Sequence, residues 1–226
     1  MKIIARIKND YKNKFGIPRQ SGLCDGVISK IVFESEYRAP EALRGIEGFS
    51  HLWLIWEFSE SKRDSWSPTV RPPRLGGNKR VGVFATRSPF RPNPIGLSSV
   101  RLLSVEKEQG LGTVLLVSGA DLLDGTPIYD IKPYVAFSDS HPDAISGFAD
   151  EVKDKSLEVC IPTALSHLIP EDKREALFEI LKEDPRPSYQ NDSEREYGMT
   201  FSDLEIKFSV DGNALTVTDI QKIGRK

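Results

Sequence analysis

Short apolar, β-branched runs alternate with glycine- and proline-rich turns along the first 137 residues. Runs with the length and composition of β-strands occur at residues 2–7, 27–33, 81–85, 97–105, 113–118 and 128–135. Residues 51–58 are nearly all apolar, which predicts a strand buried on both faces. Residues 38–49 predict one short helix, with Pro40 at its start and Gly45 or Gly48 at its end. Many short strands with such turns predict a closed or nearly closed β-barrel.

The pattern changes after Phe137. Residues 138–154 are polar and predict a connection, whereas residues 157–161 predict another strand. Residues 170–183 predict a helix with proline in its first turn and one apolar face, and residues 204–217 alternate about an Asp-Gly turn, as a hairpin does. We therefore expect a mainly β protein, with a small β-barrel domain at 1–137 and a smaller α+β domain at 138–226 that docks on the barrel.

Composition is typical of a soluble protein. Of the 226 residues, 38% are hydrophobic and 28% are charged, and no apolar run is long enough to span a bilayer. The first residues show no secretory signal. Cys24 and Cys160 lie far apart without the spacing of a metal or redox pair. We expect reduced thiols and a cytoplasmic protein that does not bind membranes.

Charge is distributed unevenly along the chain, although the formal net charge is only −2. Basic residues dominate two segments, 6–19 and 62–91, each of which contains a single acidic residue. In the second segment they coincide with proline- and glycine-rich loops rather than with a helix surface. This placement favours a polyanionic partner such as RNA.

The stretch from Phe84 to Ser98 combines three prolines with Arg87 and Arg91. Because each proline restricts its own φ and the conformation of the residue before it, a stiff extended loop is expected. Arginines on such a loop lose little entropy on binding, which suits an anion or nucleotide site. The preceding loop, residues 65–79, has no predicted secondary structure and is expected to be functional or mobile.

Residues 121–127 form an acidic turn with carboxylates at Asp121 and Asp124. Such a turn can bind a nucleoside through ribose hydroxyls and an adenine edge, but the same acids can simply cap an Asp-Gly turn. The three histidines show no metal-ligand spacing. Near the C-terminus, cations stand beside aromatic residues, a pairing that suits unpaired bases: Arg186, Tyr189, Arg195 and Tyr197. No Gly-x-Gly-x-x-Gly fingerprint or phosphate-binding lysine loop occurs, which argues against a Rossmann-type site.

Several motifs, in one order, resemble the TsaA-like barrel of the TrmO tRNA methyltransferases. They are residues 14–20 (KFGIPRQ), 49–53 (FSHLW), 69–77 (TVRPPRLGG), 84–98 and 121–134, and residues 184–189 (DPRPSY) resemble that family's C-terminal domain. The likeness covers nearly the whole chain. One departure is the Pro-Ser-Tyr sequence at residues 187–189, where the family pattern leads us to expect Pro-Ala-Tyr.

The resemblance implies metal-independent methyl transfer from S-adenosylmethionine to N6 of threonylcarbamoyl-adenosine, next to the anticodon of tRNA. It also implies a homodimer in which both chains shape the site and the C-terminal domain assists tRNA binding. The implied cofactor-binding residues are Pro18, Arg19, Gln20, Ser59, Glu60, Arg87, Leu97, Asp124, Gly125, Thr126 and Pro127. We expect the substrate to contact Arg71, Arg74, Lys79, Arg91, Arg186 and Tyr189.

The chemistry leaves several assignments open. If a general base is used, Asp121, Asp124 and Tyr134 are unranked candidates. Arg87 or Arg91 is expected to pair with a carboxylate, either from the donor's methionine part or from the threonine of the modified base. Two other classes of function compete: an RNA-binding barrel that catalyses nothing, and a nucleotide hydrolase that uses the acidic turn and a metal ion.

Overall fold

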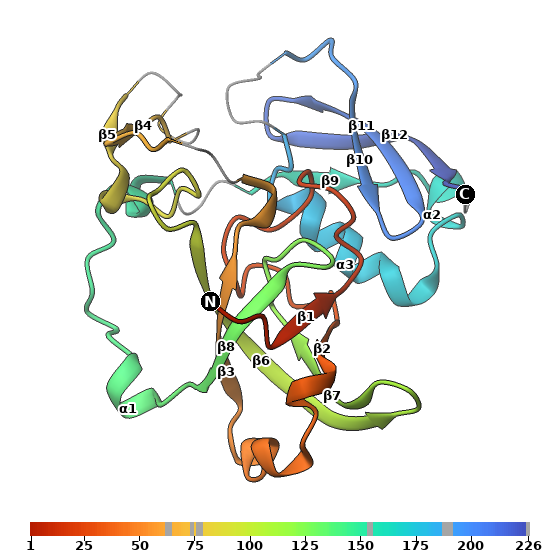
Figure 1. The fold of residues 1–226 in the computed structure, drawn as a ribbon. Coiled ribbons are helices and arrows are strands. Elements are labelled where there is room, and N and C mark those ends of the chain that lie inside the picture. The colour runs from red at the N-terminus through yellow and green to blue at the C-terminus, as the bar shows by residue number, and fades with distance from the viewer. Residues whose placement is uncertain (62–64, 73–74, 76–78, 153–155, 187–191, 225–226) are drawn as a thin grey trace.

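The computed structural model describes residues 1–226 except 62–64, 73–74, 76–78, 153–155, 187–191 and 225–226. Six antiparallel strands form a closed barrel in the order β1-β2-β7-β6-β3-β8 (Figure 1). These strands are β1 (Ala5–Lys8), β2 (Ser29–Phe33), β3 (His51–Glu57), β6 (Ile95–Glu108), β7 (Gly112–Ser118) and β8 (Pro127–Pro133). The predicted fold class, mainly β with a small barrel, is confirmed.

Side chains from alternate strand positions fill the barrel. In β3, Leu52 and Leu54 are fully buried and Trp56 is 5% exposed, whereas the residues between them are half-buried. The prediction that this strand is buried on both faces is therefore wrong. The outer face of β3 is apolar although it is only half-buried. On this face Trp53 is partly covered, and its Nε1 donates a 2.8 Å hydrogen bond to Asp139.

Trp56 needs a glycine opposite it. Its partner in the β3–β6 ladder is Gly96, and a Cβ atom at Gly96 would lie 2.2 Å from the indole ring. Only a residue without a side chain permits this approach. The indole consequently fills the end of the barrel at which β3 stops and β6 begins.

The segment between β2 and β3 contains three 3-10 turns, η1 (Ser35–Tyr37), η2 (Pro40–Leu43) and η3 (Ile46–Gly48). The single helix expected at residues 38–49 is therefore wrong. Pro40 does begin a turn, but Gly45 lies between η2 and η3 with a φ of 87°. This left-handed conformation interrupts any continuous right-handed helix.

The long loop after β3 contains secondary structure of its own. After η4 (Ser59–Ser61), β4 (Thr69–Val70) and β5 (Val81–Gly82) pair as a small antiparallel sheet, which Figure 1 shows beside the upper end of the barrel. The strand expected at residues 81–85 is only two residues long, because η6 (Val83–Ala85) replaces the rest. We call β4, β5 and the residues between Trp66 and Ala85 the hairpin lobe.

A long connection joins the barrel to the C-terminal unit. It includes α1 (Ala136–Asp139) and η7 (Gly147–Val152), and it passes along the outside of the molecule (Figure 1). The Asp139 carboxylate accepts hydrogen bonds from Val135 N–H and from Trp53, and these lower the pKa of Asp139. These bonds fix α1 to the barrel wall.

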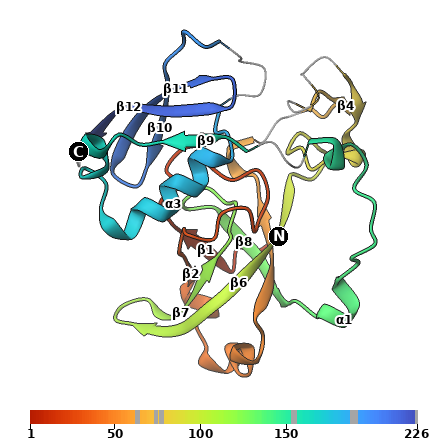
Figure 2. The ribbon, with the colours of Figure 1, turned by 180° about the vertical axis from the view of Figure 1, so that it is seen from behind.

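The C-terminal unit is a four-stranded sheet in the order β10-β11-β12-β9, with helices against it (Figure 2). Its elements are β9 (Glu158–Cys160), α2 (Thr163–Ser166), α3 (Glu171–Lys182), β10 (Tyr197–Phe201), β11 (Leu204–Asp211) and β12 (Ala214–Lys222). The predicted helix and hairpin are both present. The helix buries the expected apolar face: Ala176, Leu177, Ile180 and Leu181.

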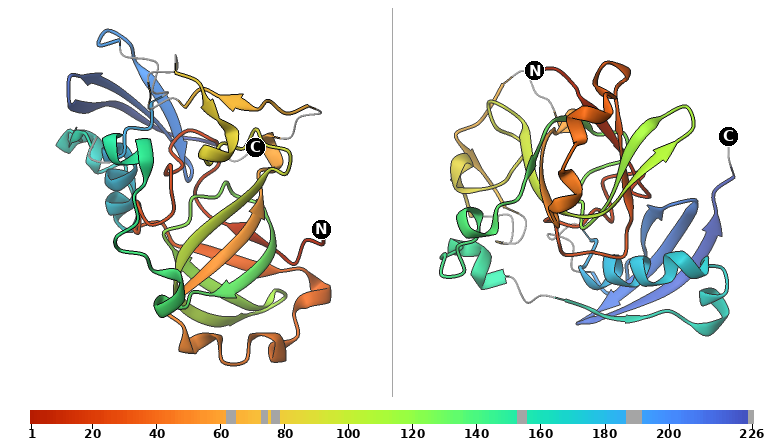
Figure 3. Two further views of the ribbon diagram at one scale, coloured as in Figure 1. Left: turned by 90° about the vertical axis from the view of Figure 1, so that its left-hand side faces the viewer. Right: turned by 90° about the horizontal axis from the view of Figure 1, so that it is seen from below.

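Both parts of the chain contribute to the core of the C-terminal unit. Tyr11, Cys24 and Val27 lie between β1 and β2 in sequence, yet they are buried in the same cluster as the apolar face of α3. Figure 3 shows the C-terminal unit against one side of the barrel. The division at residues 137 and 138 stays a prediction, and residues 11–27, which we call the shared segment, pack across it.

Candidate functional site

A hollow of about 1780 Å³ opens at the end of the barrel next to the C-terminal unit. Its walls come from the shared segment, the end of β3, the hairpin lobe, the proline-rich loop at 84–91, the start of β6, the acidic turn and the end of α3. We call this hollow the cleft. Because these segments are far apart in sequence, only the closed barrel and its docked C-terminal unit bring them together.

Eight of the eleven predicted cofactor-binding residues line the cleft. They are Pro18, Arg19, Gln20, Ser59, Glu60, Arg87, Leu97 and Thr126. Two of the contributing loops touch directly, since the Arg87 guanidinium donates a hydrogen bond to Gln20 Oε1. The Lys14 ammonium joins a third, because it donates a 2.8 Å hydrogen bond to the carbonyl of Glu60. The loops are thus held to one another by polar contacts.

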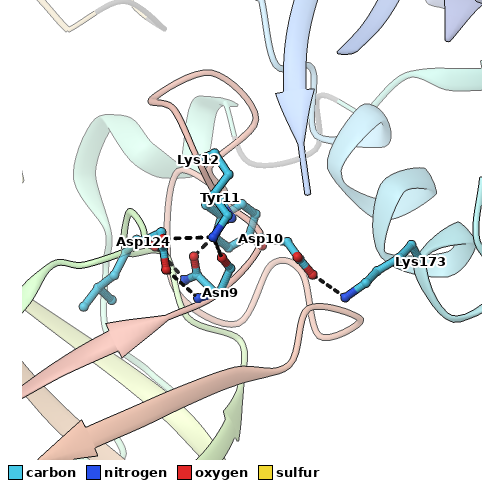
Figure 4. A network of polar contacts seen from close by, with 7 residues as sticks. Asn9, Asp10, Tyr11, Lys12, Asp124 and Lys173 are labelled. Carbon is cyan, nitrogen blue, oxygen red and sulfur yellow. Dashed lines mark hydrogen bonds and ion pairs between the residues drawn. The ribbon is translucent and has the colours of Figure 1, made fainter. Parts of the chain in front are cut away.

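The other three, Asp124, Gly125 and Pro127, are not among the residues that line the cleft. Asp124 accepts hydrogen bonds from Asn9 N–H at 2.9 Å and from the Lys12 ammonium at 2.8 Å (Figure 4). Gly125 has a φ of 79° and donates its N–H to Ile7 at 2.8 Å. In this chain Asp124 and Gly125 therefore brace the acidic turn, and Thr126 of the same turn lines the cleft.

Asp121 does line the cleft, at the end of a chain of hydrogen bonds. Trp56 Nε1 donates to Ser98 Oγ at 2.9 Å, and Ser98 Oγ donates to the Asp121 carboxylate. Burial raises the pKa of Asp121, and the hydrogen bond from Ser98 and the positive charge of Arg87 partly oppose this rise. The result is a carboxyl group more readily protonated than an ordinary aspartate.

Sequence reasoning missed Trp56 and Ser98. Ser98 has a detectable signal, because it is a polar residue at an inward position of β6, between Gly96 and Val100 on the same face, and it is fully buried there. A polar residue at such a position needs a hydrogen-bond partner. Ser98 has two such partners: the Trp56 indole donates to its hydroxyl, and the Asp121 carboxylate accepts from it.

Tyr134 lies at the other end of the barrel. It follows the last residue of β8, and its N–H donates a 2.9 Å hydrogen bond to the carbonyl of His51 at the start of β3. Its ring packs against Trp53, with centroids 5.4 Å apart. Within one chain, the structure does not bring Tyr134 to the cleft.

The predicted substrate-binding residues divide into three groups. Arg71, Arg91 and Arg186 line the cleft, Lys79 is exposed outside it, and Arg74 and Tyr189 lie outside the described residues. Arg91 donates a 3.2 Å hydrogen bond to the carbonyl of Thr86, which steadies it on the proline-rich loop.

Arg186 is held deep in the wall of the cleft, with 8% of its side chain exposed. It makes two hydrogen bonds to the Asp184 carboxylate, at 2.8 and 3.0 Å, while Asp184 itself has a φ of 53°. The Asp184 carbonyl accepts a 2.7 Å hydrogen bond from Arg19. One donor, Arg186 Nη1, is buried with no hydrogen-bond partner in the described part of the chain. Such a donor is well placed for a ligand acceptor.

Tyr197 does not have the role predicted from the sequence, which was to stack with an unpaired base. Arg186 and Arg195 both lie over the Tyr197 ring, at 5.8 and 5.5 Å from its centroid. However, Tyr197 is only 6% exposed and belongs to the core of the C-terminal unit. Its ring is therefore a support for the arginines and has no free face for an unpaired base.

Two further observations concern metal ions and membranes. Among the residues that the structure describes, no three His, Cys, Asp or Glu side chains lie close enough together to hold a metal ion. Within the same residues, none of the helices combines the length and apolar character needed to cross a membrane.

Comparison with protein families finds two matches, one for each part of the chain. A model of the tRNA-methyltransferase O N-terminal domain matches residues 6–140, and a model of the TrmO C-terminal domain matches residues 156–223. Together they span the barrel, the cleft and the C-terminal sheet.

Individual relatives match over almost their whole length. The tRNA (adenine(37)-N6)-methyltransferase of Escherichia coli (strain K12) is 41% identical over 215 residues, which cover 92% of this chain and 91% of that protein. A Pseudomonas aeruginosa relative, 40% identical over 210 residues (90% of this chain, 89% of its own), has a name that refers to S-adenosylmethionine-dependent methyl transfer. The crystal structure of TrmO from Pseudomonas aeruginosa superposes with a TM-score of 0.77 at 32% identity and covers 97% of each chain.

Proposed function

Because the chain belongs to the TrmO family of tRNA methyltransferases, we propose that it transfers a methyl group from S-adenosylmethionine to N6 of adenosine 37 in tRNA. The observation that carries this proposal is the cleft, in which residues from seven segments meet, among them Arg87 and Asp121. Placing donor and acceptor in one such site can lower the barrier by about 7–11 kcal/mol in favourable cases.

The lining of the cleft fits the donor, which supplies an activated methyl group on a sulfonium when bound. A guanidinium at Arg87 matches the carboxylate of its methionine part, and Leu97 and Trp56 offer apolar surface. Carboxylates at Asp121 and Glu60 complement its positive charge. Pro18, Arg19, Gln20, Ser59 and Thr126 complete the set that would hold it.

The acceptor that we propose is adenosine 37 with a threonylcarbamoyl group on N6. Its nitrogen is urea-like and a weak nucleophile, so the enzyme must orient it and help remove its proton. The threonine carboxylate requires a cation, and Arg91 and Arg186 both line the cleft with guanidinium groups. The unpartnered Nη1 of Arg186 supports a role in binding that carboxylate or a phosphate.

Among the three candidate bases, the surroundings favour Asp121. When the new carbon–nitrogen bond forms and the carbon–sulfur bond breaks, the proton on N6 must leave, and Asp121 is the candidate in the cleft with a raised pKa. Asp124 is occupied by Asn9 and Lys12, and Tyr134 lies at the far end of the barrel. We therefore assign proton acceptance to Asp121.

The proposal extends to how the RNA and a second protomer bind. The basic residues around the cleft, with the C-terminal unit and Lys79, bind the tRNA backbone. The roles expected for Arg74 and Tyr189 in tRNA binding stay predictions from the sequence. A homodimer is supported by the connection, on which Phe137 and Ile145 are 94% and 92% exposed. We place the reaction in the cytoplasm, in keeping with the two free cysteines.

The test supplies purified protein with labelled S-adenosylmethionine and tRNA, with or without the threonylcarbamoyl group, and then identifies the labelled nucleoside. We expect label on adenosine 37 of the modified tRNA alone, also in the presence of a chelator. Equal label in both RNAs would mean that the acceptor is wrong. RNA binding without any transfer would instead support a non-catalytic RNA-binding barrel, and loss of activity with the chelator would support a metal-dependent enzyme.

A further inference from the structure

Two large aromatic side chains of the hairpin lobe are exposed side by side. Trp66 is 50% exposed and Phe84 is 72% exposed, and their ring centroids lie 6.1 Å apart with the planes inclined by 30°. The Arg91 guanidinium lies 6.0 Å from the Phe84 centroid. Neither aromatic belongs to the core of the barrel or of the C-terminal unit. The packing of the fold therefore does not account for them.

The backbone that carries these rings is ordered by local bonds. Val83 N–H donates a 2.9 Å hydrogen bond to the carbonyl of Pro68. This bond links the residues just after Trp66 to the residue just before Phe84. Thr86 N–H and Oγ1 both bond to the carbonyl of Val83, at 3.2 and 2.8 Å. The rings are thus presented on a fixed frame, so little entropy would be lost when a ligand stacks on them.

Every charged residue in the segment that carries the two rings is basic. Residues 65–95 contain no aspartate or glutamate, and the exposed basic residues Arg71 and Arg80 line the cleft, as Phe84 does. Exposed aromatic faces within a basic surface are the combination that binds single-stranded nucleic acid, because bases stack on the rings while cations hold the phosphates. An apolar protein partner would not need this excess of cations.

We propose that Trp66 and Phe84 form a stacking platform for an unpaired base of the tRNA anticodon loop, next to the adenosine that enters the cleft. This inference rests on the proposed function and adds a binding subsite to it. Phe84 lines the cleft itself, whereas Trp66 lies outside its lining, so the platform leads from the surface into the cleft. Arg91 adds a cation to the Phe84 face.

The test compares Phe84→Leu, Phe84→Tyr and the control Phe178→Leu in the full-length protein. Phe178 is 44% exposed on α3 and does not line the cleft, so it matches the substitution without touching the site. Binding is measured to an anticodon stem-loop RNA and to a duplex of the stem alone. Phe84→Leu should weaken binding of the stem-loop by about 5- to 100-fold, whereas Phe84→Tyr should retain the wild-type affinity.

Two more readouts separate stacking from other roles of Phe84. The salt dependence of stem-loop binding should be unchanged in Phe84→Leu, because no phosphate contact is lost. The affinity for S-adenosylmethionine should also be unchanged. Tryptophan fluorescence should be quenched by the stem-loop, and Trp66→Phe should remove most of that quenching, since Trp56 is only 5% exposed in the cleft wall and Trp53 is bonded to Asp139.

The platform would be overturned if Phe84→Leu bound the stem-loop as tightly as the wild type, if Phe178→Leu showed the same loss, or if only donor affinity fell. Methyl transfer by the wild-type protein is measured in parallel. Failure of transfer with intact, ring-dependent RNA binding would reject the proposed function and leave the platform standing. Normal transfer, together with RNA binding that does not depend on the rings, would reject the platform and leave the proposed function standing.

Discussion

At the scale of single residues, Asp121 and Asp124 stand three positions apart and meet different surroundings. Both oxygens of Asp124 accept hydrogen bonds from the shared segment or its neighbours, which fixes the acidic turn. Asp121 faces the cleft instead, and its burial raises its pKa. The direction in which each side chain points decides whether a carboxylate braces the fold or is available for chemistry.

Replacing Asp121 with asparagine tests its assignment as the base. Asp121→Asn should lower the rate of methyl transfer by about 10²- to 10⁴-fold, because the amide cannot accept the proton. In the wild type, the rate should fall as the pH drops through the raised pKa, above the usual value of about 3.9 for aspartate. Single-turnover rates between about pH 4 and 8 measure both effects.

The control for this substitution is Asp143→Asn, at an exposed position of the connection. It should transfer at the wild-type rate. Because a raised pKa favours the protonated form in the folded state, the Asp121 contribution to stability is full below the unfolded-state pKa and is lost as the pH rises through the folded-state pKa. Asp121→Asn should therefore not lower the free energy of unfolding at neutral pH. A rate within a few-fold of the wild type would reject Asp121 as the base.

At the scale of elements, the shared segment is held between the barrel and α3. Gly26 N–H donates a 2.8 Å hydrogen bond to the Glu179 carboxylate, and the Lys173 ammonium pairs with Asp10, directly before the segment. A Cβ atom at Gly26 would lie 2.9 Å from the backbone of Ala176, so helix and segment touch without a side chain between them. This docking fixes the positions of the predicted cofactor-binding residues Pro18, Arg19 and Gln20, since they lie within the segment.

Truncating the Glu179 side chain, which also lies beside the Cys24 thiol, tests this contact. Glu179→Ala should lower the free energy of unfolding by about 1–3 kcal/mol, because it leaves Gly26 N–H without its partner in a part-buried position. Glu175→Ala on the exposed face of the same helix is the matched control and should cost much less. Denaturant unfolding at neutral pH measures both. Equal losses in the two variants would show that the contact with the shared segment contributes nothing of its own.

Several elements could be predicted from sequence because their pattern depends on local periodicity. β6, β7, β11, β12 and α3 are present close to the expected bounds. The apolar run of β3 did not reveal its one-sided burial, because partly covered outer residues such as Trp53 are as apolar as inner ones. The two residues of β4 are too few for any periodicity to be seen, and their pairing with β5 depends on distant atoms.

At the scale of the whole molecule, two hydrophobic cores meet at the cleft. One fills the barrel, and the other combines the C-terminal unit with Tyr11, Cys24 and Val27 of the shared segment. Arg19 adds a polar link, because it donates to the carbonyl of Asp184. The C-terminal unit is therefore part of the frame of the cleft, in addition to its proposed contact with tRNA.

Removing residues 156–226 tests this dependence. Loss of the second core exposes Tyr11, Cys24 and Val27 to water, so the shared segment should lose its fixed conformation while the barrel strands remain paired. Amide hydrogen exchange should become fast at residues 11–27 and stay slow in β3 and β6, and affinity for S-adenosylmethionine should fall. Slow exchange at residues 11–27 in the shortened protein would contradict the shared core.

The sequence alone determined the strand and helix periodicity and the family to which the chain is similar, since both depend on neighbouring residues or on motif order. The tertiary structure decided which residues face the cleft. Asp121, Asp124 and Tyr134 are equivalent candidates in the sequence, but the direction of each side chain and its partners arise only when the barrel closes. The Trp56–Ser98–Asp121 chain likewise joins residues 42 and 23 positions apart, which the pairing of β3 with β6 and the turn after β7 bring together.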